Sequence, residues 1–214
     1  PMGNLMVFRK GEKRLAKPVM LCAHMDEVGV IVKRVTDDGI LKFGFVGGVD
    51  PRVVIGRRVK FGDVTGVVGI KAVHLTTASE RKTMPKTRDL YIDIGASGKK
   101  DALARVAPGD YGVFDSDIVE FGDGLLKAKA IDDRLGCAVL LTLLQTQPPI
   151  DTWFVFTVQE EVGLRGAKIT AERLRPALAI CLEGTPADDN FTAPDEAQGA
   201  LKKGVQIRFR DGSM

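Results

Sequence analysis

The feature that most constrains this fold is a set of three short apolar runs, each followed by a histidine or a carboxylate. The runs are PVMLCA at 18–23, WFVFTV at 153–158 and ALAICL at 177–182. Their length and uniform apolar character are typical of strands that are buried on both faces. Such strands occur in parallel sheets that helices cover on both sides. We therefore expect the three runs to lie side by side in one sheet.

The segments around these runs carry the helices that a parallel sheet needs. Residues 133–144 read DRLGCAVLLTLL and predict an apolar helix, and residues 166–174 predict a second helix before Pro176. The order of strands and helices predicts an α/β fold with a mixed, mainly parallel sheet. Residues 5–9 predict a further strand, and residues 184–204, rich in Pro, Asp, Ala and Gly, predict a loop.

The sequence pattern of strands and helices stops near Val28, and a different pattern continues until about Phe114. Short β-branched runs recur there, and glycines and turns such as Asp38-Gly39 separate them. Many short strands with frequent turn signals are typical of a small β-barrel or sandwich. We therefore predict an α/β domain made of residues 1–27 and 118–214, interrupted by a β-barrel domain at residues 28–117.

Composition narrows the class of protein. Hydrophobic residues make up 44% of the chain and charged residues 28%, with a net charge of +3. The basic residues are scattered, which argues against a nucleic-acid partner, and no apolar run is long enough to span a bilayer. The three cysteines (Cys22, Cys137 and Cys181) lie in apolar runs, so we expect buried, reduced thiols and a cytoplasmic protein.

The residues that carry chemistry gather where the predicted strands end. In chain order they are His24 and Asp26 after the first run, Asp132 and Asp133 before the first predicted helix, Glu160 and Glu161 after the second run, and Glu183 after the third. Ligands bind outside the carboxyl ends of strands in parallel α/β sheets. We therefore expect these side chains to meet at one edge of the sheet.

An imidazole that meets several carboxylates is a donor set suited to zinc, cobalt or manganese. Without cations, the repulsion between so many carboxylates would keep some of them protonated. Two divalent ions would neutralise this charge, and a shared carboxylate can bridge them. His24 and Asp26 point to the same side of an extended segment, so Asp26 is expected to fix the ring nitrogen of His24 that does not bind metal.

Each of these residues also has a purely structural interpretation. The alternatives are a strand-end histidine at His24, a helix cap at Asp132 or Asp133, a pairing of Asp133 with Arg134, a solvated pair at Glu160-Glu161 and a strand terminus at Glu183. The metal hypothesis rests on their coincidence at one sheet edge. The other histidine, His74, lies in the β-rich region and is interpreted as a structural or surface residue.

Three motifs resemble those of the M42 family of metallo-aminopeptidases. They are AHMDEVGVIV at 23–32, KAIDDRLGCAVLL at 129–141 and VQEEVGLRGA at 158–167, with supporting segments at 47–59 and 89–96. The resemblance extends across essentially the whole chain. It implies a catalytic α/β domain with a β-barrel insert used for dimerisation, and a homo-oligomer in which such dimers assemble further, in many members, into a tetrahedral dodecamer.

The resemblance also implies a role for each site residue. The ligands of two divalent ions, zinc or cobalt, would be His24, Asp132, Glu161 and Glu183. Asp132 would bridge the ions, with Glu183 on the ion that His24 binds and Glu161 on the other. Glu160 would be the general base, Asp26 would orient His24, and the Asp132-Asp133 bond would be cis.

Two features depart from the family pattern. Members usually have Asp where Glu183 stands, and Glu is one methylene longer but still a carboxylate ligand. The final histidine ligand of the family lies downstream of the matched motifs, and a helical segment precedes the residues equivalent to Gly3-Asn4. We therefore expect both of these parts to lie outside this sequence.

The leading hypothesis is a dinuclear metal-dependent aminopeptidase that removes the N-terminal residue of peptides. Glu160 would take a proton from water and give it to the leaving amine. The alternatives are a metal-dependent deacylase of N-acyl amino acids, a metal-independent glycoside hydrolase with two carboxylates, and a non-catalytic fragment or scaffold that lacks one metal ligand.

Overall fold

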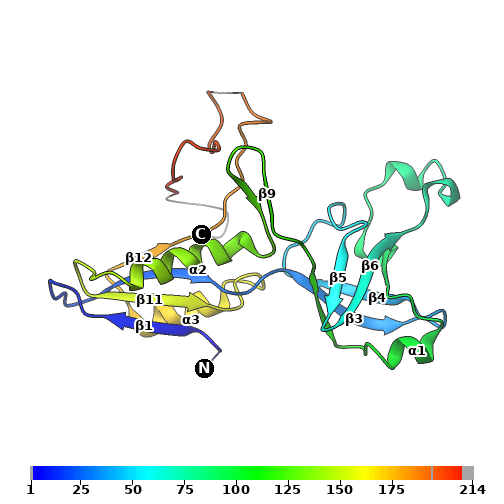
Figure 1. Cartoon of the computed structure of the whole chain (residues 1–214), viewed down its shortest axis with the longest axis horizontal. Helices are drawn as coiled ribbons and strands as arrows, with labels where there is room; N and C mark the ends of the chain where they lie inside the picture. Colours follow the sequence, from blue (N-terminus) through cyan, green and yellow to red (C-terminus); the bar gives the residue numbers. More distant parts are fainter. Residues whose placement is uncertain (1, 194, 209–214) are drawn as a thin grey trace.

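The computed structural model describes residues 2–193 and 195–208 and has two lobes (Figure 1). One lobe contains a four-stranded sheet with helices, and the other is a closed six-stranded barrel. The chain passes from the sheet to the barrel and back to the sheet (Figure 1). The predicted fold, an α/β domain interrupted by a β-barrel, is therefore confirmed.

The sheet brings the three apolar runs together in the order β1-β11-β2-β12. Its strands are β1 (Leu5–Arg9), β2 (Val19–His24), β11 (Thr152–Thr157) and β12 (Leu178–Cys181). Strand β2 pairs in parallel with both β11 and β12, whereas β1 pairs antiparallel with β11. The carboxyl ends of β2, β11 and β12 therefore lie at the same edge, as the sequence predicted.

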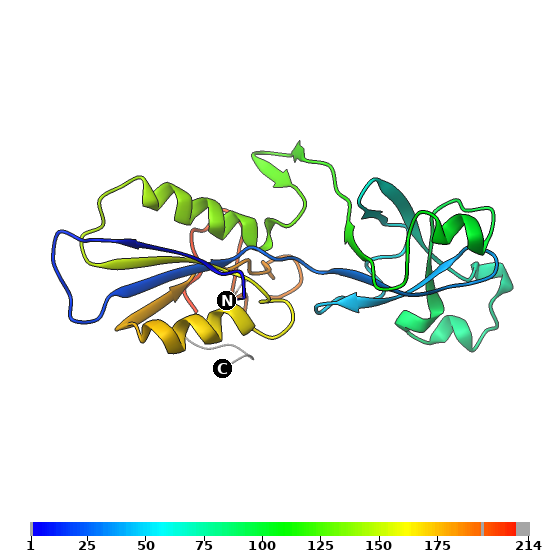
Figure 2. The same cartoon turned by 90° about the horizontal axis from the view of Figure 1, so that it is seen from below.

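Two helices, α2 (Ile131–Leu144) and α3 (Arg165–Leu174), cover opposite faces of this sheet (Figure 2). Successive strand residues point to opposite faces, so each face has its own core. Phe154 and Phe156 pack with Leu140 on the α2 side. Val155 packs with Met20 and with the partly buried Leu174 of α3 on the other side. Full burial of each such side chain contributes roughly 1.5–3 kcal/mol to folding.

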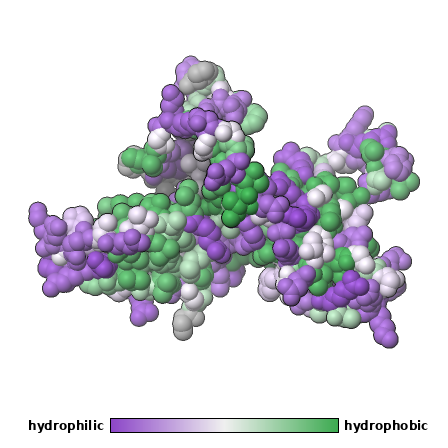
Figure 3. All heavy atoms as spheres, in the orientation of Figure 1, coloured by the Kyte–Doolittle hydropathy of each residue, from purple (hydrophilic) through white to green (hydrophobic). Residues whose placement is uncertain are grey.

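The prediction that the run at 177–182 is a buried strand was wrong. Leu178 and Ile180 are 54% and 44% exposed, and Cys181 is also exposed although we expected a buried thiol. Among the described residues, β12 pairs only with β2, so its far edge has no neighbouring strand. The outer face of α2 is exposed as well, because Leu135 is 63% and Leu141 is 55% exposed. Figure 3 shows hydrophobic surface over this lobe.

The barrel lobe closes in the order β3-β4-β7-β6-β5-β8. Its strands are β3 (Gly29–Val35), β4 (Leu41–Val46), β5 (Arg58–Phe61), β6 (Val64–Ile70), β7 (Leu90–Asp93) and β8 (Tyr111–Phe114). The short helices are η1 (Val73–Leu75), η2 (Glu80–Lys82), η3 (Thr87–Asp89) and α1 (Lys99–Leu103). Along each strand, every second side chain points into the barrel. Val30, Leu41 and Ile92 are examples that are fully buried there.

A two-stranded hairpin leads from the barrel back to α2. It consists of β9 (Val119–Phe121) and β10 (Leu125–Lys127), which pair antiparallel.

Residues 184–193 and 195–204 contain no helix or strand, which agrees with the predicted loop. None of the helices in the described ranges combines the length and apolar character that a membrane crossing needs.

The side chain of Asn4 ties together three elements that approach the sheet edge. Its Oδ1 accepts a hydrogen bond from the Val158 N–H at 3.0 Å, and its Nδ2 donates to the Gly166 oxygen at 2.8 Å and to Thr170 Oγ1 at 2.6 Å. A Cβ at Gly166 would lie only 2.3 Å from the Val158 oxygen, so this close approach requires glycine. Asn4 therefore positions the segment that leaves β11 and carries Glu160.

We expect Asn4→Ala to lower the free energy of unfolding by about 1–3 kcal/mol, because it leaves the partly buried Val158 N–H without its acceptor. Urea unfolding followed by circular dichroism measures the loss. Lys17→Ala, a change of an exposed side chain, is the control and should have little effect. Equal stability of the two variants would show that the Asn4 hydrogen bonds contribute nothing.

Candidate metal centre

The candidate site lies where β2, β11 and β12 end. His24 is the last residue of β2 and pairs in register with Thr157 of β11. Glu160 and Glu161 follow β11 by three and four residues, and Glu183 follows β12 by two. Asp132 reaches the same edge from the start of α2. Parallel pairing thus brings together residues that are more than 130 positions apart in the sequence.

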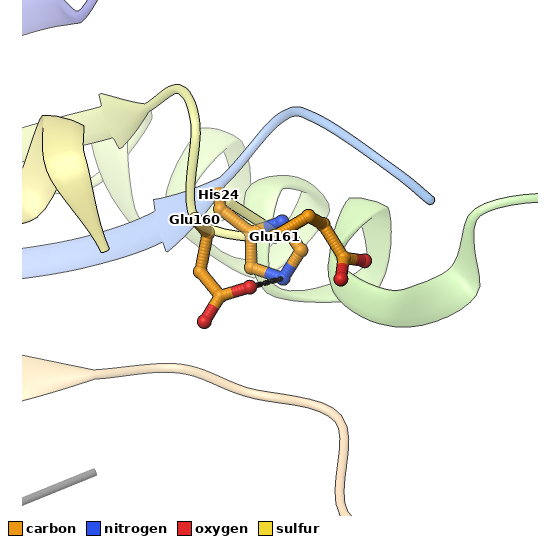
Figure 4. Close-up of side chains that lie close together, drawn as sticks. All are labelled: His24, Glu160 and Glu161. Atoms are coloured by element: carbon orange, nitrogen blue, oxygen red, sulfur yellow. Dashed lines mark ion pairs between the residues drawn. The ribbon is translucent and has the colours of Figure 1, made fainter. Parts of the chain in front are cut away.

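Three carboxylates surround Nε2 of His24. Asp132 Oδ1 lies 3.1 Å from this nitrogen, Glu183 Oε1 lies 3.4 Å away and Glu160 Oε2 lies 3.9 Å away. The imidazole is 2% exposed, whereas the carboxylates are partly open to solvent. Figure 4 shows Glu160 and Glu161 on opposite sides of the ring. The predicted ligands and the predicted base therefore come together.

The other ring nitrogen of His24 is held by Asp26, but through the backbone. Nδ1 lies 3.1 Å from the Asp26 backbone oxygen and 3.6 Å from its carboxylate. With the proton on Nδ1 donated to that oxygen, Nε2 is the ring nitrogen that faces the carboxylates and would bind a metal ion. The Asp26 side chain instead accepts hydrogen bonds from the N–H groups of Glu160 and Glu161, both at 3.1 Å. Asp26 therefore orients both the imidazole and the glutamate pair.

Asp133 has a structural role that the sequence analysis left open. Its carboxylate is 1% exposed and accepts hydrogen bonds from the His24 N–H at 3.0 Å and the Gly136 N–H at 3.1 Å. Asp132 and Asp133 have non-helical backbone angles, so the regular turns of α2 begin after Asp133, and its bond to the Gly136 N–H three residues ahead is that of an N-cap. The sequence alone could indicate an N-cap at Asp133, because a cap bonds to the N–H three residues ahead. It could not indicate the hydrogen bond from the His24 N–H. Arg134 does not pair with Asp133 in the structure; its Nε donates to the Met25 oxygen.

Two further features complete the surroundings of His24. Cys137 donates from Sγ to the His24 oxygen at 3.1 Å, so the backbone of His24 is held from the α2 side on both its N–H and its carbonyl. The Asp132-Asp133 peptide bond is cis, as the resemblance implied.

His74 is exposed and lies in η1 of the barrel, which agrees with its interpretation as a surface residue.

The protein groups of the site shift one another's pKa values. Burial alone lowers the pKa of His24, but Glu183, Glu160 and Asp132 outweigh it and raise that pKa to about 10. Burial, and then neighbouring carboxylates, raise the pKa values of Glu160 and Glu161. These shifts show that the carboxylates are crowded and partly desolvated, so that positive charge beside them is favoured.

The donors at this edge fit a divalent cation. Ligand atoms of His24, Glu160 and Glu161 lie within 4.8 Å of one another, and so do those of His24, Asp133 and Glu183. Asp133 is already engaged by two backbone N–H groups, so its neighbour Asp132 is the better donor on that side. One imidazole nitrogen with several carboxylate oxygens suits zinc, cobalt or manganese. The residues present therefore fit the metal that the sequence predicted.

A cavity of about 390 Å³ opens beside the site, and residues of both lobes line it. Asp132 and Glu161 line it on the side of the metal centre, and Arg57 and Lys127 contribute positive charge. Its wall also contains an ion pair between Glu27 and Lys129. The cavity therefore borders the residues that would hold metal, and its wall carries three basic side chains (Arg57, Lys127 and Lys129) beside three acidic ones (Glu27, Asp132 and Glu161).

Comparison with known proteins places this architecture in a family. The model of the M42 glutamyl aminopeptidase family matches residues 3–214. A protein of Acetivibrio thermocellus with a provisional aminopeptidase name is 43% identical over an alignment 217 residues long, which covers 100% of this chain and 62% of that protein.

Solved structures agree with the match. An aminopeptidase from the archaeon Desulfurococcus kamchatkensis superposes with a TM-score of 0.84 and 36% identity, covering 94% of this chain and 57% of that chain. The TET1 peptidase of Pyrococcus horikoshii, which can assemble into a tetrahedron or a large octahedral shell, gives 0.73 and 35%, covering 85% and 56%. The chain thus spans between 56% and 62% of the length of these relatives. The family match, the shared fold and the motifs around His24 and Glu160 together show that the chain belongs to the M42 peptidase family.

Proposed function

We propose that this chain forms the greater part of a metal-dependent aminopeptidase that hydrolyses the N-terminal residue of peptides. The observation that carries the proposal is the meeting of Asp132, Glu160 and Glu183 around Nε2 of His24. Membership of a peptidase family supports the reaction class, because the site residues lie within the matched region. Two metal ions and the restriction to N-terminal residues are part of the proposal.

In this proposal His24, Asp132, Glu161 and Glu183 hold two divalent ions, with zinc or cobalt preferred. When bound, the ions supply Lewis acidity, which polarises the scissile carbonyl and lowers the pKa of water. Burial, and then the neighbouring Glu160, raise the pKa of Glu161, which supports this arrangement, since a carboxylate in such surroundings gains from a cation. The mixture of imidazole and carboxylate donors supports zinc or cobalt.

Glu160 is proposed to be the general base. Its carboxylate reaches the centre of the site, and burial raises its pKa toward the range in which it can take and return a proton. It would remove a proton from the attacking water and deliver that proton to the leaving amine. The Asp26 carboxylate keeps Glu160 in place by accepting its backbone N–H.

The substrate is proposed to enter through the cavity beside Asp132 and Glu161. Among the described residues, no carboxylate forms an ion pair with Arg57 or Lys127 in its wall, whereas Lys129 is neutralised by Glu27. Once metal compensates Asp132 and Glu161, the wall presents net positive charge. We therefore propose that substrates with an acidic N-terminal residue are preferred.

The assembly and location of the protein are also proposals. We propose a homo-oligomer that is built from dimers formed through the barrel lobe. The TET1 peptidase of Pyrococcus horikoshii, which forms closed shells, supports this view. The thiol state of the three cysteines supports a cytoplasmic location, since disulfides are rare there.

We predict that Glu160→Gln lowers kcat by about 10²–10⁴-fold, because the amide keeps the shape of the side chain but cannot accept the proton. Steady-state hydrolysis of aminoacyl p-nitroanilides measures the loss, and metal content should stay unchanged. The matched control is Glu172→Gln on the surface of α3. Turnover close to that of the unmodified protein would reject Glu160 as the base.

We predict that a chelator abolishes activity and that zinc or cobalt restores it. His24→Ala should lower the number of bound metal ions, because it removes the nitrogen donor around which the carboxylates gather. The matched control, His74→Ala, changes an exposed histidine and should keep full metal content. Elemental analysis of the purified proteins makes the comparison. Undiminished activity in chelator would favour the glycoside hydrolase alternative, which needs no metal.

We predict that charge reversal at Lys127 to Glu lowers kcat/KM for glutamyl p-nitroanilide about tenfold relative to alanyl p-nitroanilide, a change of about 1.4 kcal/mol. Lys82→Glu, at the exposed end of η2 in the barrel lobe, is the control and should not alter this ratio. An unchanged ratio at Lys127 would remove the proposed preference. Activity only on N-acetyl amino acids would identify a deacylase instead.

A further inference from the structure

Two cysteines face each other across β2 and β12. Cys22 and Cys181 are direct partners in the parallel register of the two strands. Their sulfur atoms lie 3.2 Å apart, and the Cys22 thiol donates a hydrogen bond to Sγ of Cys181. The proposed ligands His24 and Glu183 each follow one of these cysteines by two residues. The pair is therefore built into the two strands that end at the metal centre.

The arrangement is compatible with a disulfide bond. Neighbouring strands in a sheet lie about 4.7–4.9 Å apart, which falls within the Cα separation of about 4.4–6.8 Å found in disulfides. Closing the bond requires the sulfurs to approach from 3.2 Å to about 2.05 Å. A shift of roughly 1 Å can be shared between two side-chain rotations and a small movement of β12. No large rearrangement of the sheet is required.

The two thiols differ in their access to solvent. Cys22 is 4% exposed and packs with Met20 and Val155 under α3, whereas Cys181 is exposed on the edge strand. A small oxidant in solution therefore meets Cys181 first. The remaining cysteine, Cys137, lies in the core on the α2 side and donates to the His24 oxygen at 3.1 Å. Cys22 is thus the thiol positioned to react with an oxidised Cys181.

We propose that Cys22 and Cys181 form a site of reversible oxidation that closes to an intramolecular disulfide on exposure to a hydroperoxide. In the first step the Cys181 sulfur attacks the peroxide, the O–O bond breaks, and a sulfenic acid and one molecule of water or alcohol form. In the second step the Cys22 sulfur attacks that sulfenic sulfur, the S–O bond breaks and a second molecule of water leaves. The two sulfurs together lose two electrons, which the peroxide accepts.

The pairing has a protective consequence. A sulfenic acid that finds no second thiol can be oxidised further to sulfinic acid, which reducing thiols do not reverse. The neighbouring Cys22 traps Cys181 before that stage, so a dithiol reductant can restore both cysteines. The crosslink also joins β2 to β12 directly before His24 and Glu183. Reversible oxidation of this cysteine pair should therefore affect how His24 and Glu183 are held at the proposed metal centre.

The test is to treat the full chain with hydrogen peroxide and follow its intact mass and its alkylatable thiols after denaturation. The expected product is lighter by two hydrogen atoms, has one alkylatable thiol in place of the three in the sequence, and returns to the starting mass with dithiothreitol. Peptide mapping should assign the bond to Cys22 and Cys181. These readouts do not depend on catalytic activity, so they hold whether or not the proposed function is correct.

Variants separate the roles of the three cysteines. Cys22→Ala should leave Cys181 to gain two oxygen atoms that dithiothreitol does not remove, and Cys181→Ser should abolish the lighter product. Cys137→Ser, with its thiol on the other face of the sheet, should still give the disulfide. Oxygen addition at Cys181 without a disulfide in the unmodified chain, or a disulfide that maps to Cys137, would overturn the proposal.

Discussion

The position of His24 depends on one buried carboxylate. Asp133 accepts the His24 N–H and at the same time caps the helix that begins beside it, so the end of β2 and the start of α2 are held by the same side chain. The hydrogen bond from Cys137 to the His24 oxygen adds a second tie to the same helix. Because α2 holds both the N–H and the carbonyl of His24, its imidazole is presented to the carboxylates in one orientation.

The carboxylates around this imidazole are held close together against their mutual repulsion. Asp26 contacts both sides of the site. Its carboxylate fixes the backbone of the Glu160-Glu161 pair, and its backbone oxygen fixes the ring of His24. One residue thus sets the distance between the nitrogen donor and two acidic side chains. Burial, and then this crowding of carboxylates, raise the pKa values of Glu160 and Glu161, and divalent cations would compensate the negative charge.

The barrel affects the site as well as the overall shape. Its strands return the chain to α2 through the hairpin of β9 and β10, and the cavity beside Asp132 has walls from both lobes. Arg57 comes from the segment before β5, whereas Lys127 ends β10. The charge offered to a ligand therefore depends on how the two lobes meet, which no local pattern in the sequence expresses.

Much of the fold and most of the candidate site could be predicted from local patterns. The apolar runs indicated strands, and the residues that follow them indicated one polar sheet edge, because parallel strands place their carboxyl ends together. The exposure of β12 could not be predicted, because an apolar run does not reveal whether a strand has one neighbour or two. For the same reason Cys181 was wrongly expected to be buried.

The sequence by itself determined which side chains carry the chemistry and at which strand ends they stand. Only the tertiary structure decided how those side chains are held. Asp133 reaches the His24 backbone across 109 positions, Asp26 reaches Glu160 across 134, and Cys22 meets Cys181 across 159. Hydrogen bonds over such separations are set by strand register and helix packing, whereas sequence periodicity records only whether each residue faces the core or the solvent.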